Sequence, residues 1–123
     1  MDDKMKVVLA EDELITALDI KQHLKREFNA EVITTNKGGD IAPLTIDHKP
    51  DIIISDIKLI DNTNGIDAVK KLKKEYDVPV IFVSAYTMAY YLEQISRIPN
   101  AFILPKPLNF NLFYSLVKSL IKN

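Results

Sequence analysis

The 123-residue sequence predicts an α/β domain in which helices cover both faces of a doubly wound, five-stranded parallel sheet. One observation is the apolar run Ile52–Ser55, which precedes Asp56 and indicates a strand buried on both faces. The other is that five short apolar segments alternate along the chain with five stretches of helical periodicity. Such alternation implies right-handed crossovers and a parallel sheet. We expect a single domain that spans residues 1–123.

The composition is that of an ordinary globular protein, with 47% hydrophobic and 27% charged residues. The 16 Lys and Arg nearly balance the 17 Asp and Glu, so charge gives no case for nucleic-acid binding. The absence of cysteine excludes disulfides, thiolate zinc sites and thiol catalysis. No secretion signal and no apolar stretch of the roughly 18 residues needed for a membrane span is present. We expect a cytoplasmic protein without a membrane partner.

Two strands and two helices are predicted before the central strand. The run Lys6–Ala10 stops at three acidic residues and indicates a first strand. An amphipathic helix is predicted over Glu13–Phe28, and its apolar residues are Leu14, Ala17, Leu18, Leu24 and Phe28. Val32–Thr35 indicates a second strand. Asp40 is expected to cap a short helix that ends before Ile52.

A loop and then alternating helices and strands are predicted after Asp56. The loop Ile57–Gly65 is rich in Asp, Asn, Thr and Gly. The following segments are a helix at Ile66–Tyr76, a strand at Pro79–Ser84, a helix at Met88–Ile98 and a strand at Ala101–Leu104. Asn109 is expected to cap a last helix, whose apolar face is Leu112, Phe113, Leu116, Val117, Leu120 and Ile121.

Polar and charged side chains follow four of the five predicted strands. Glu11 and Asp12 follow the first strand, Asp56 the third, Ser84 ends the fourth and Lys106 comes after the fifth. Because the carboxyl ends of parallel strands share one edge of the sheet, these groups are expected to converge. Carboxylate oxygens suit Mg²⁺, and an ammonium and a hydroxyl can contact phosphoryl oxygens. The set predicts a site that forms and holds an aspartyl phosphate.

The four motifs Glu11-Asp12, Asp56, Ser84-Ala85 and Lys106-Pro107 together resemble the receiver domain of two-component response regulators. They stand in the family's order and spacing, and the resemblance covers essentially the whole chain. It is closest in kind to a stand-alone, chemotaxis-regulator-like receiver. The resemblance implies a flavodoxin-like sheet with strand order 2-1-3-4-5 and five helices. The switch point of such a sheet lies between its first and third strands.

The resemblance also implies a phosphoacceptor and a metal site. Asp56 matches the phosphoacceptor, and Glu11 and Asp12 match the family's acidic pair. Asp12 is expected to bind Mg²⁺ (or Mn²⁺) directly, and Glu11 directly or through water. Asp56 and the backbone carbonyl of Lys58 are expected to complete the protein ligands.

Further roles follow from the same resemblance. Ser84 matches the switch hydroxyl and Lys106 the lysine that contacts the phosphoryl group, and the bond from Lys106 to Pro107 is expected to be cis. The position three before the lysine is usually an aromatic switch residue, but here it is Ile103, with Phe102 beside it. Either the aromatic coupling is absent or a local irregularity moves Phe102 into place.

The loop after Asp56 departs from the family pattern in two ways. Gly65 follows Asp56 by nine residues where many receivers have eight, so the loop is expected to be reshaped without moving the metal ligands. Lys58 lies two residues after Asp56, near the path of an attacking water. We expect its side chain to alter the lifetime of the phosphoryl group.

The resemblance implies a signalling switch that accepts a phosphoryl group from a histidine kinase or a histidine phosphotransfer protein. Phosphorylation is expected to shift a conformational equilibrium near Leu104 and the last two helices. The signal is expected to pass to an unknown downstream protein. Beyond self-phosphorylation from small phosphodonors and slow autodephosphorylation, we expect no enzymatic activity. One alternative is a phosphatase of the haloacid dehalogenase type, which needs a second aspartate where this chain has Lys58. Another is a receiver-like module that interacts without phosphorylation, which the complete site disfavours.

Other polar side chains are predicted to have no part in the site. His23 and His48 lack a second ligand at metal spacing and are expected to be exposed helix residues. The lysines at 70, 71, 73 and 74 are expected to form a solvated helix face. Tyr91, in the helix predicted at Met88–Ile98, is expected to be a packing residue.

Overall fold

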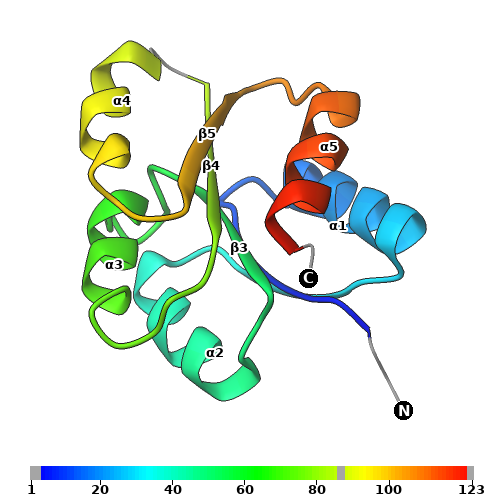
Figure 1. Cartoon of the computed structure of the whole chain (residues 1–123), viewed down its shortest axis with the longest axis horizontal. Coiled ribbons are helices and arrows are strands. Elements are labelled where there is room, and N and C mark those ends of the chain that lie inside the picture. The colour runs from blue at the N-terminus through cyan, green and yellow to red at the C-terminus, as the bar shows by residue number, and fades with distance from the viewer. Residues whose placement is uncertain (1–3, 86–87, 122–123) are drawn as a thin grey trace.

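A computed structural model describes residues 4–85 and 88–121, except for the side chain of Met88. These residues form a five-stranded parallel sheet with the strand order β2-β1-β3-β4-β5 (Figure 1). The strands are β1 (Lys6–Ala10), β2 (Glu31–Thr35), β3 (Ile52–Asp56), β4 (Val80–Ser84) and β5 (Ala101–Pro105). The predicted fold class and strand order are confirmed.

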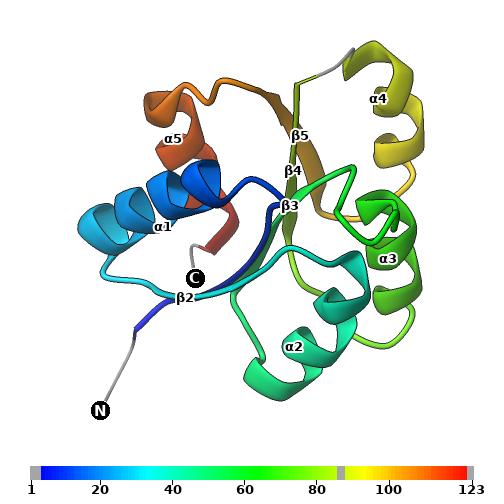
Figure 2. The same ribbon diagram turned by 180° about the vertical axis from the view of Figure 1, so that it is seen from behind.

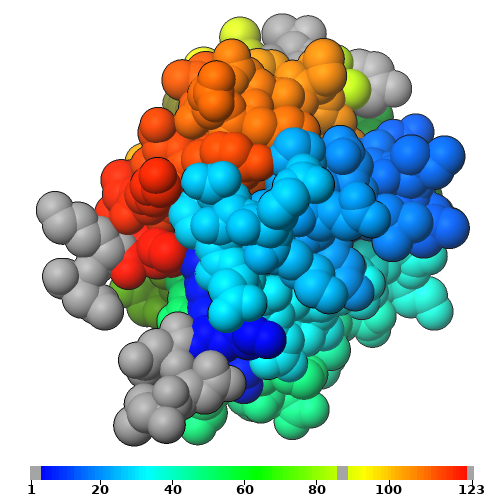
Figure 3. All heavy atoms as spheres, turned by 90° about the vertical axis from the view of Figure 1, so that its right-hand side faces the viewer, coloured from blue at the N-terminus to red at the C-terminus, as the bar shows by residue number. Residues whose placement is uncertain are grey.

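Helices cover both faces of the sheet, as Figures 1 and 2 show from opposite sides. The helices are α1 (Leu14–Phe28), α2 (Ile41–His48), α3 (Gly65–Leu72), α4 (Met88–Ser96) and α5 (Phe110–Ile121), with a short 3₁₀ turn η1 (Gly38–Asp40) before α2. The helices α1 and α5 lie side by side on one face (Figure 3), and α2, α3 and α4 lie on the other. None of the helices in the described part of the chain combines the length and apolar character needed to cross a bilayer.

The apolar strands separate two hydrophobic cores. Alternate side chains of a strand point to opposite faces of a sheet. On β3 and β4, Ile53 and Phe82 therefore face the core under α2, α3 and α4, while Ile54 and Val83 face the core under α1 and α5. All four side chains are fully buried. The continuous apolar runs in the sequence exist because these strands are covered twice.

The register of the strands brings their carboxyl ends to one edge. Ala10 at the end of β1 pairs with Ser55, Asp56 at the end of β3 pairs with Val83, and Ser84 at the end of β4 pairs with Pro105. The polar residues that follow each strand therefore leave the sheet at nearly the same level. This edge carries the candidate site.

The buried stripe of α1 differs from the predicted one. The buried residues are Ala17, Ile20 and Leu24, whereas Leu14 and Leu18 are 73% and 48% exposed. Each residue of an α-helix is turned by about 100° from the one before it, so Leu18 points away from the stripe that contains Ala17. The apolar residues of this helix fit two overlapping stripes, one with Leu14 and Leu18 and one with Ala17, Ile20 and Leu24. Contact with the sheet buries the second stripe.

Helix caps were predicted with mixed success. The side chain of Asn109 accepts a hydrogen bond from the backbone N–H of Leu112 and caps α5, as predicted. Asp40 does not cap α2, because its carboxylate accepts a hydrogen bond from the hydroxyl of Thr35 instead (2.6 Å). Asn64 caps α3 by accepting from two backbone N–H groups of its first turn, a role that the sequence analysis missed.

Three side chains that were expected to be exposed are partly buried, namely those of His23, Lys73 and, at the end of α2, His48. The imidazole of His23 stacks on the ring of Phe110 with their centroids 3.5 Å apart, and its Nδ1 lies within hydrogen-bond distance of the hydroxyl of Tyr114. The side chain of Lys73 is only 8% exposed, and its ammonium donates to the carbonyl of Pro99. Both partners are distant in sequence, so the local pattern held no sign of them.

One buried hydroxyl offers a test of the packing beneath α2. Thr45 is fully buried, and its Oγ1 has no hydrogen-bond partner. A buried hydroxyl without a partner keeps its desolvation cost, so Thr45→Val should raise the free energy of unfolding by about 1 kcal/mol. Denaturant unfolding would measure the change, with the exposed Thr34→Val as a control expected to change little. A loss of stability in Thr45→Val would contradict this account of the core.

Candidate functional site

Asp56 ends β3, and both of its carboxylate oxygens have partners. Oδ1 accepts a hydrogen bond from the backbone N–H of Ile57 (2.7 Å). Oδ2 lies 2.9 Å from the ammonium of Lys106. The side chain of Asp56 is 14% exposed, so the carboxylate is oriented by its partners and still reachable from solvent.

Lys106 reaches this edge from the segment after β5. Its backbone N–H donates to the carbonyl of Ser84 (2.8 Å), which continues the pairing of β4 with β5. Its peptide bond to Pro107 is cis. Burial by itself would lower the pKa of the Lys106 ammonium, but the hydrogen bonds to Asp56 and Glu11 raise it above its usual value. The side chain is therefore a fixed positive charge at the edge of the sheet.

Glu11 is the second partner of this ammonium. Its Oε2 accepts a hydrogen bond from Lys106 (3.1 Å), and its Oε1 lies 3.0 Å from the same nitrogen without hydrogen-bond geometry. The residue is only 2% exposed. Burial raises the pKa of the Glu11 carboxyl to about 7, against the opposing effect of Lys106. The pKa of this carboxyl therefore lies close to neutral pH.

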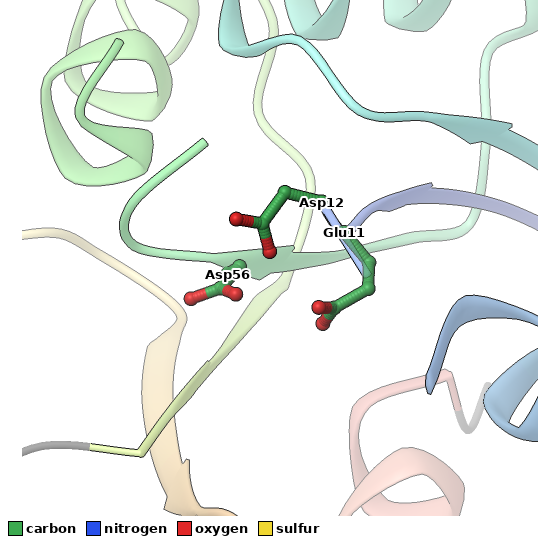
Figure 4. Close-up of side chains that lie close together, drawn as sticks. All are labelled: Glu11, Asp12 and Asp56. Carbon is green, nitrogen blue, oxygen red and sulfur yellow. The ribbon is translucent and has the colours of Figure 1, made fainter. Parts of the chain in front are cut away.

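Three carboxyl groups lie together at the ends of β1 and β3, as Figure 4 shows for Glu11, Asp12 and Asp56. One oxygen of each lies within 4.8 Å of an oxygen of the others. Asp12 is exposed, in contrast to Glu11 beside it. A cluster of acidic oxygens, one of them open to solvent, fits a hard divalent cation such as Mg²⁺, which keeps part of its water shell.

A pocket of about 280 Å³ opens over these groups, and its lining includes Asp12, Asp56, Lys58, Ser84 and Lys106. The sequence analysis selected all five, and the fold brings them into one wall. Glu11 is not part of this lining, and its carboxylate contacts the ammonium of Lys106, which is. Ser84 is only 3% exposed, so its hydroxyl is held close to the end of β4.

Tyr91 on α4 also lines this pocket, and the sequence analysis did not place it there. Its helical spacing indicated a packing residue, and it is indeed 8% exposed and part of the core beneath α4. The side chain contributes to the core and to the wall of the site at once. Only the position of α4 over the ends of the strands could have revealed the second contact.

The two candidates for a switch residue on β5 lie outside this pocket. Residues 101–105 pair with β4 in an unbroken register, so no irregularity moves Phe102 inward. Phe102 is 37% exposed, and Ile103 packs against the core beneath α4. The irregularity that would move Phe102 into place is therefore not present in β5, which leaves Ile103 at the position that is usually aromatic in the family.

The loop between β3 and α3 approaches the strand end closely. A Cβ atom on Gly65 would lie 2.3 Å from the carbonyl oxygen of Asp56, so only glycine fits at the start of α3. The backbone N–H of Gly65 also donates to the carbonyl of Ile57 (2.6 Å), and Lys58 forms an isolated antiparallel bridge with Asn64. These contacts close the longer loop at its base.

Comparison with known proteins agrees with this arrangement. A family model of the response regulator receiver domain matches residues 7–118. The phyllosphere-induced regulator PhyR from Methylorubrum extorquens is 29% identical over 103 residues, which are 83% of this chain and 38% of PhyR. The transcriptional regulatory protein PdtaR from Mycobacterium tuberculosis is 26% identical over 106 residues, which are 86% of this chain and 51% of PdtaR.

A solved structure extends the likeness to the fold. A crystal structure of a variant of the anti-anti-sigma factor PhyR from Bartonella quintana matches with a TM-score of 0.78 and 28% identity, over 96% of this chain and 48% of that one. The chain thus spans about half the length of these relatives or less. With nearly all of its length matched by the family model, the chain belongs to the response regulator receiver domain family.

Proposed function

We propose that this receiver domain, spanning residues 1–123, is a phosphoacceptor switch in which Asp56 takes up a phosphoryl group. The observation that carries the proposal is the position of the Asp56 carboxylate, between the Asp12 carboxylate and the Lys106 ammonium in one open pocket. Receiver domains are signalling domains of two-component systems and not enzymes in the usual sense. The donor that suits this site is a phosphohistidine of a histidine kinase or of a histidine phosphotransfer protein.

The transfer itself needs only a nucleophile and charge stabilisation. A carboxylate oxygen of Asp56 forms a bond to phosphorus while the bond from phosphorus to the donor breaks. The donor leaves with the bonding electron pair, as an imidazole that takes a proton from water or, with acetyl phosphate, as acetate. Lys106, 2.9 Å from Oδ2 of Asp56, can move onto a phosphoryl oxygen as charge builds there, and the hydroxyl of Ser84 can donate to another.

Asp12, Asp56 and the backbone carbonyl of Lys58 are the proposed protein ligands of Mg²⁺ (or Mn²⁺), with Glu11 bound directly or through water. The cation, when bound, offsets the negative charge of the acidic cluster and of the phosphoryl oxygens. Glu11 already shares its oxygens with Lys106, so we assign it the weaker role. Asp12 is exposed at the mouth of the pocket and is the better direct ligand.

The proposed output is a contact with another protein. Phosphorylation draws Ser84 toward Asp56, and β5, which pairs with β4 up to Ser84, transmits the shift toward Leu104, α4 and α5. Ile103, packed under α4, is a better candidate than the outward-facing Phe102 for sensing this shift. PhyR of Bartonella quintana is described as an anti-anti-sigma factor. By analogy, the partner class proposed for this chain is an anti-sigma factor. A cytoplasmic site of action fits this role.

The central test is the chemical identity of the phosphoacceptor. Wild type and Asp56→Asn are incubated with acetyl phosphate and Mg²⁺ and examined by intact-mass spectrometry. We expect the wild type to gain the mass of one phosphoryl group and Asp56→Asn to gain none, since the amide is a poor nucleophile. An adduct that survives in Asp56→Asn would refute the assignment. Rapid turnover of phosphomonoesters without an adduct would indicate a hydrolase instead.

The buried carboxyl of Glu11 predicts a pH dependence of stability. Its pKa is about 7 in the folded protein against an ordinary value of 4.5, so its stabilising effect is complete below pH 4.5 and lost as the pH rises through about 7. Glu11→Gln should not show this loss of stability. Its free energy of unfolding at pH 8 without divalent cations should therefore be higher than that of wild type. Allowing for solvent screening, we expect the free energies of unfolding of the two proteins to differ by on the order of 1 kcal/mol. Stability curves that stay parallel from pH 5 to pH 8 would exclude the effect.

Lys58 is expected to affect how long the phosphoryl group lasts. Its side chain is exposed and the residue lines the pocket that holds Asp56. Removing a positive charge there changes how water approaches the phosphorus atom, so Lys58→Ala should lose the phosphoryl group at a different rate from wild type. Loss of the adduct over time is followed by mass spectrometry, with Lys70→Ala, an exposed lysine on α3, as control. Equal rates in Lys58→Ala and wild type would rule out this role.

A further inference from the structure

The tip of the loop between β3 and α3 is bound to a segment far away in the sequence. The carboxylate of Asp61 accepts hydrogen bonds from the backbone N–H groups of Gly38 (3.1 Å to Oδ1) and Gly39 (3.1 Å to Oδ2). Its Oδ1 also accepts from the N–H of Thr63 within the loop (3.2 Å). One side chain thus joins the turn after β2 to the loop after β3.

Two further contacts hold the same pair of segments together. The backbone N–H of Ile60 donates to the carbonyl of Asn36 (3.1 Å). Gly38 is packed so tightly that a Cβ atom on it would lie 2.4 Å from Cγ2 of Thr63. The loop tip is therefore seated against the turn by both hydrogen bonds and close packing. Of the hydrogen bonds between the two segments, those to Asp61 are made by a side chain and can be removed by substitution.

The topology gives this contact a consequence for the site. β1 lies between β2 and β3 in the sheet, so the contact passes over the end of β1, where Glu11 and Asp12 follow the strand. The base of the loop is closed by the bridge between Lys58 and Asn64, and its tip is held by Asp61. Lys58, whose carbonyl is a proposed metal ligand, is part of this base and precedes Asp61 by three residues. Its position then depends on both attachments.

We propose that Asp61 is a positioning residue for the cation site, which it serves by fixing the loop that carries the Lys58 carbonyl. The inference rests on the proposed function of Asp56 and its neighbours. Asp61 touches neither the cation nor the phosphoryl group in this proposal and acts through the loop. The hydrogen bond from Gly39, with others from Thr63 and Gly38, holds the pKa of Asp61 at about 2, so the carboxylate keeps its charge at any pH where a receiver works.

Mg²⁺ affinity measured by calorimetry tests the proposal. Asp61→Ala removes all three hydrogen bonds, and we expect the dissociation constant for Mg²⁺ to rise about tenfold, as for other residues that orient a metal ligand. Asp61→Asn keeps one oxygen that can accept from Gly38 and Thr63. Its dissociation constant for Mg²⁺ should therefore lie between those of Asp61→Ala and wild type. The control is Asp47→Ala, which removes the same charge from an exposed position on α2 and should bind Mg²⁺ as wild type does.

A purely structural role of Asp61 is tested by measuring Mg²⁺ affinity and folding separately. Thermal unfolding of each variant identifies the temperature range in which it is fully folded, and the calorimetry is done there. Equal Mg²⁺ affinity in folded Asp61→Ala and wild type would overturn the inference while leaving the role of Asp56 intact. Equal losses in Asp61→Ala and Asp47→Ala would also overturn it, since only net charge would then matter. A wild type that neither binds Mg²⁺ nor forms the adduct would overturn the proposed function as well.

Discussion

The Lys106 ammonium between the carboxylates of Asp56 and Glu11 is the contact on which the site depends. Glu11, Asp12 and Asp56 would repel one another at this edge without a nearby cation, and Glu11 is buried where a charge is costly. The lysine reduces both costs at once, with its nitrogen 2.9 Å from Asp56 and 3.0 Å from Glu11. Its placement comes from the backbone, because its N–H continues the pairing between β4 and β5.

The sheet can hold this charge cluster because its strands are buried and packed on both faces. The core side chains of β1, β3 and β4 are fully buried. The strand ends cannot separate without disturbing two cores. The loops beyond those ends have fewer constraints, and here they are tied across the sheet by side chains such as Asp61. The packed strands therefore set the spacing of the acids, and the loops adjust what surrounds them.

The sequence was sufficient for the fold and for finding the polar residues that the strand ends bring together, because both depend on strong local patterns. Doubly covered strands require continuous apolar runs, and the chemistry requires particular residues directly after them. Most errors occurred where a contact outside the local helical pattern decides the outcome. Asp40 caps no helix because Thr35 takes its carboxylate, and His23 is partly buried because Phe110 on α5 covers it. Tyr91 was assigned to packing alone, since nothing local shows that α4 overhangs the pocket.

The geometry also explains how one phosphoryl group could be sensed by the rest of the domain. The ammonium of Lys106 forms ion pairs with both Asp56 and Glu11. A phosphoryl group carries up to about two negative charges, where the Asp56 carboxylate carried one. In the proposed switch, the ammonium would then be drawn away from Glu11 and toward the phosphoryl group. Because the backbone of Lys106 is bonded to the carbonyl of Ser84, a shift of the lysine pulls on the ends of β4 and β5 together. In the proposed switch, a change of charge at one oxygen would thus become a displacement of the strand ends beside α4.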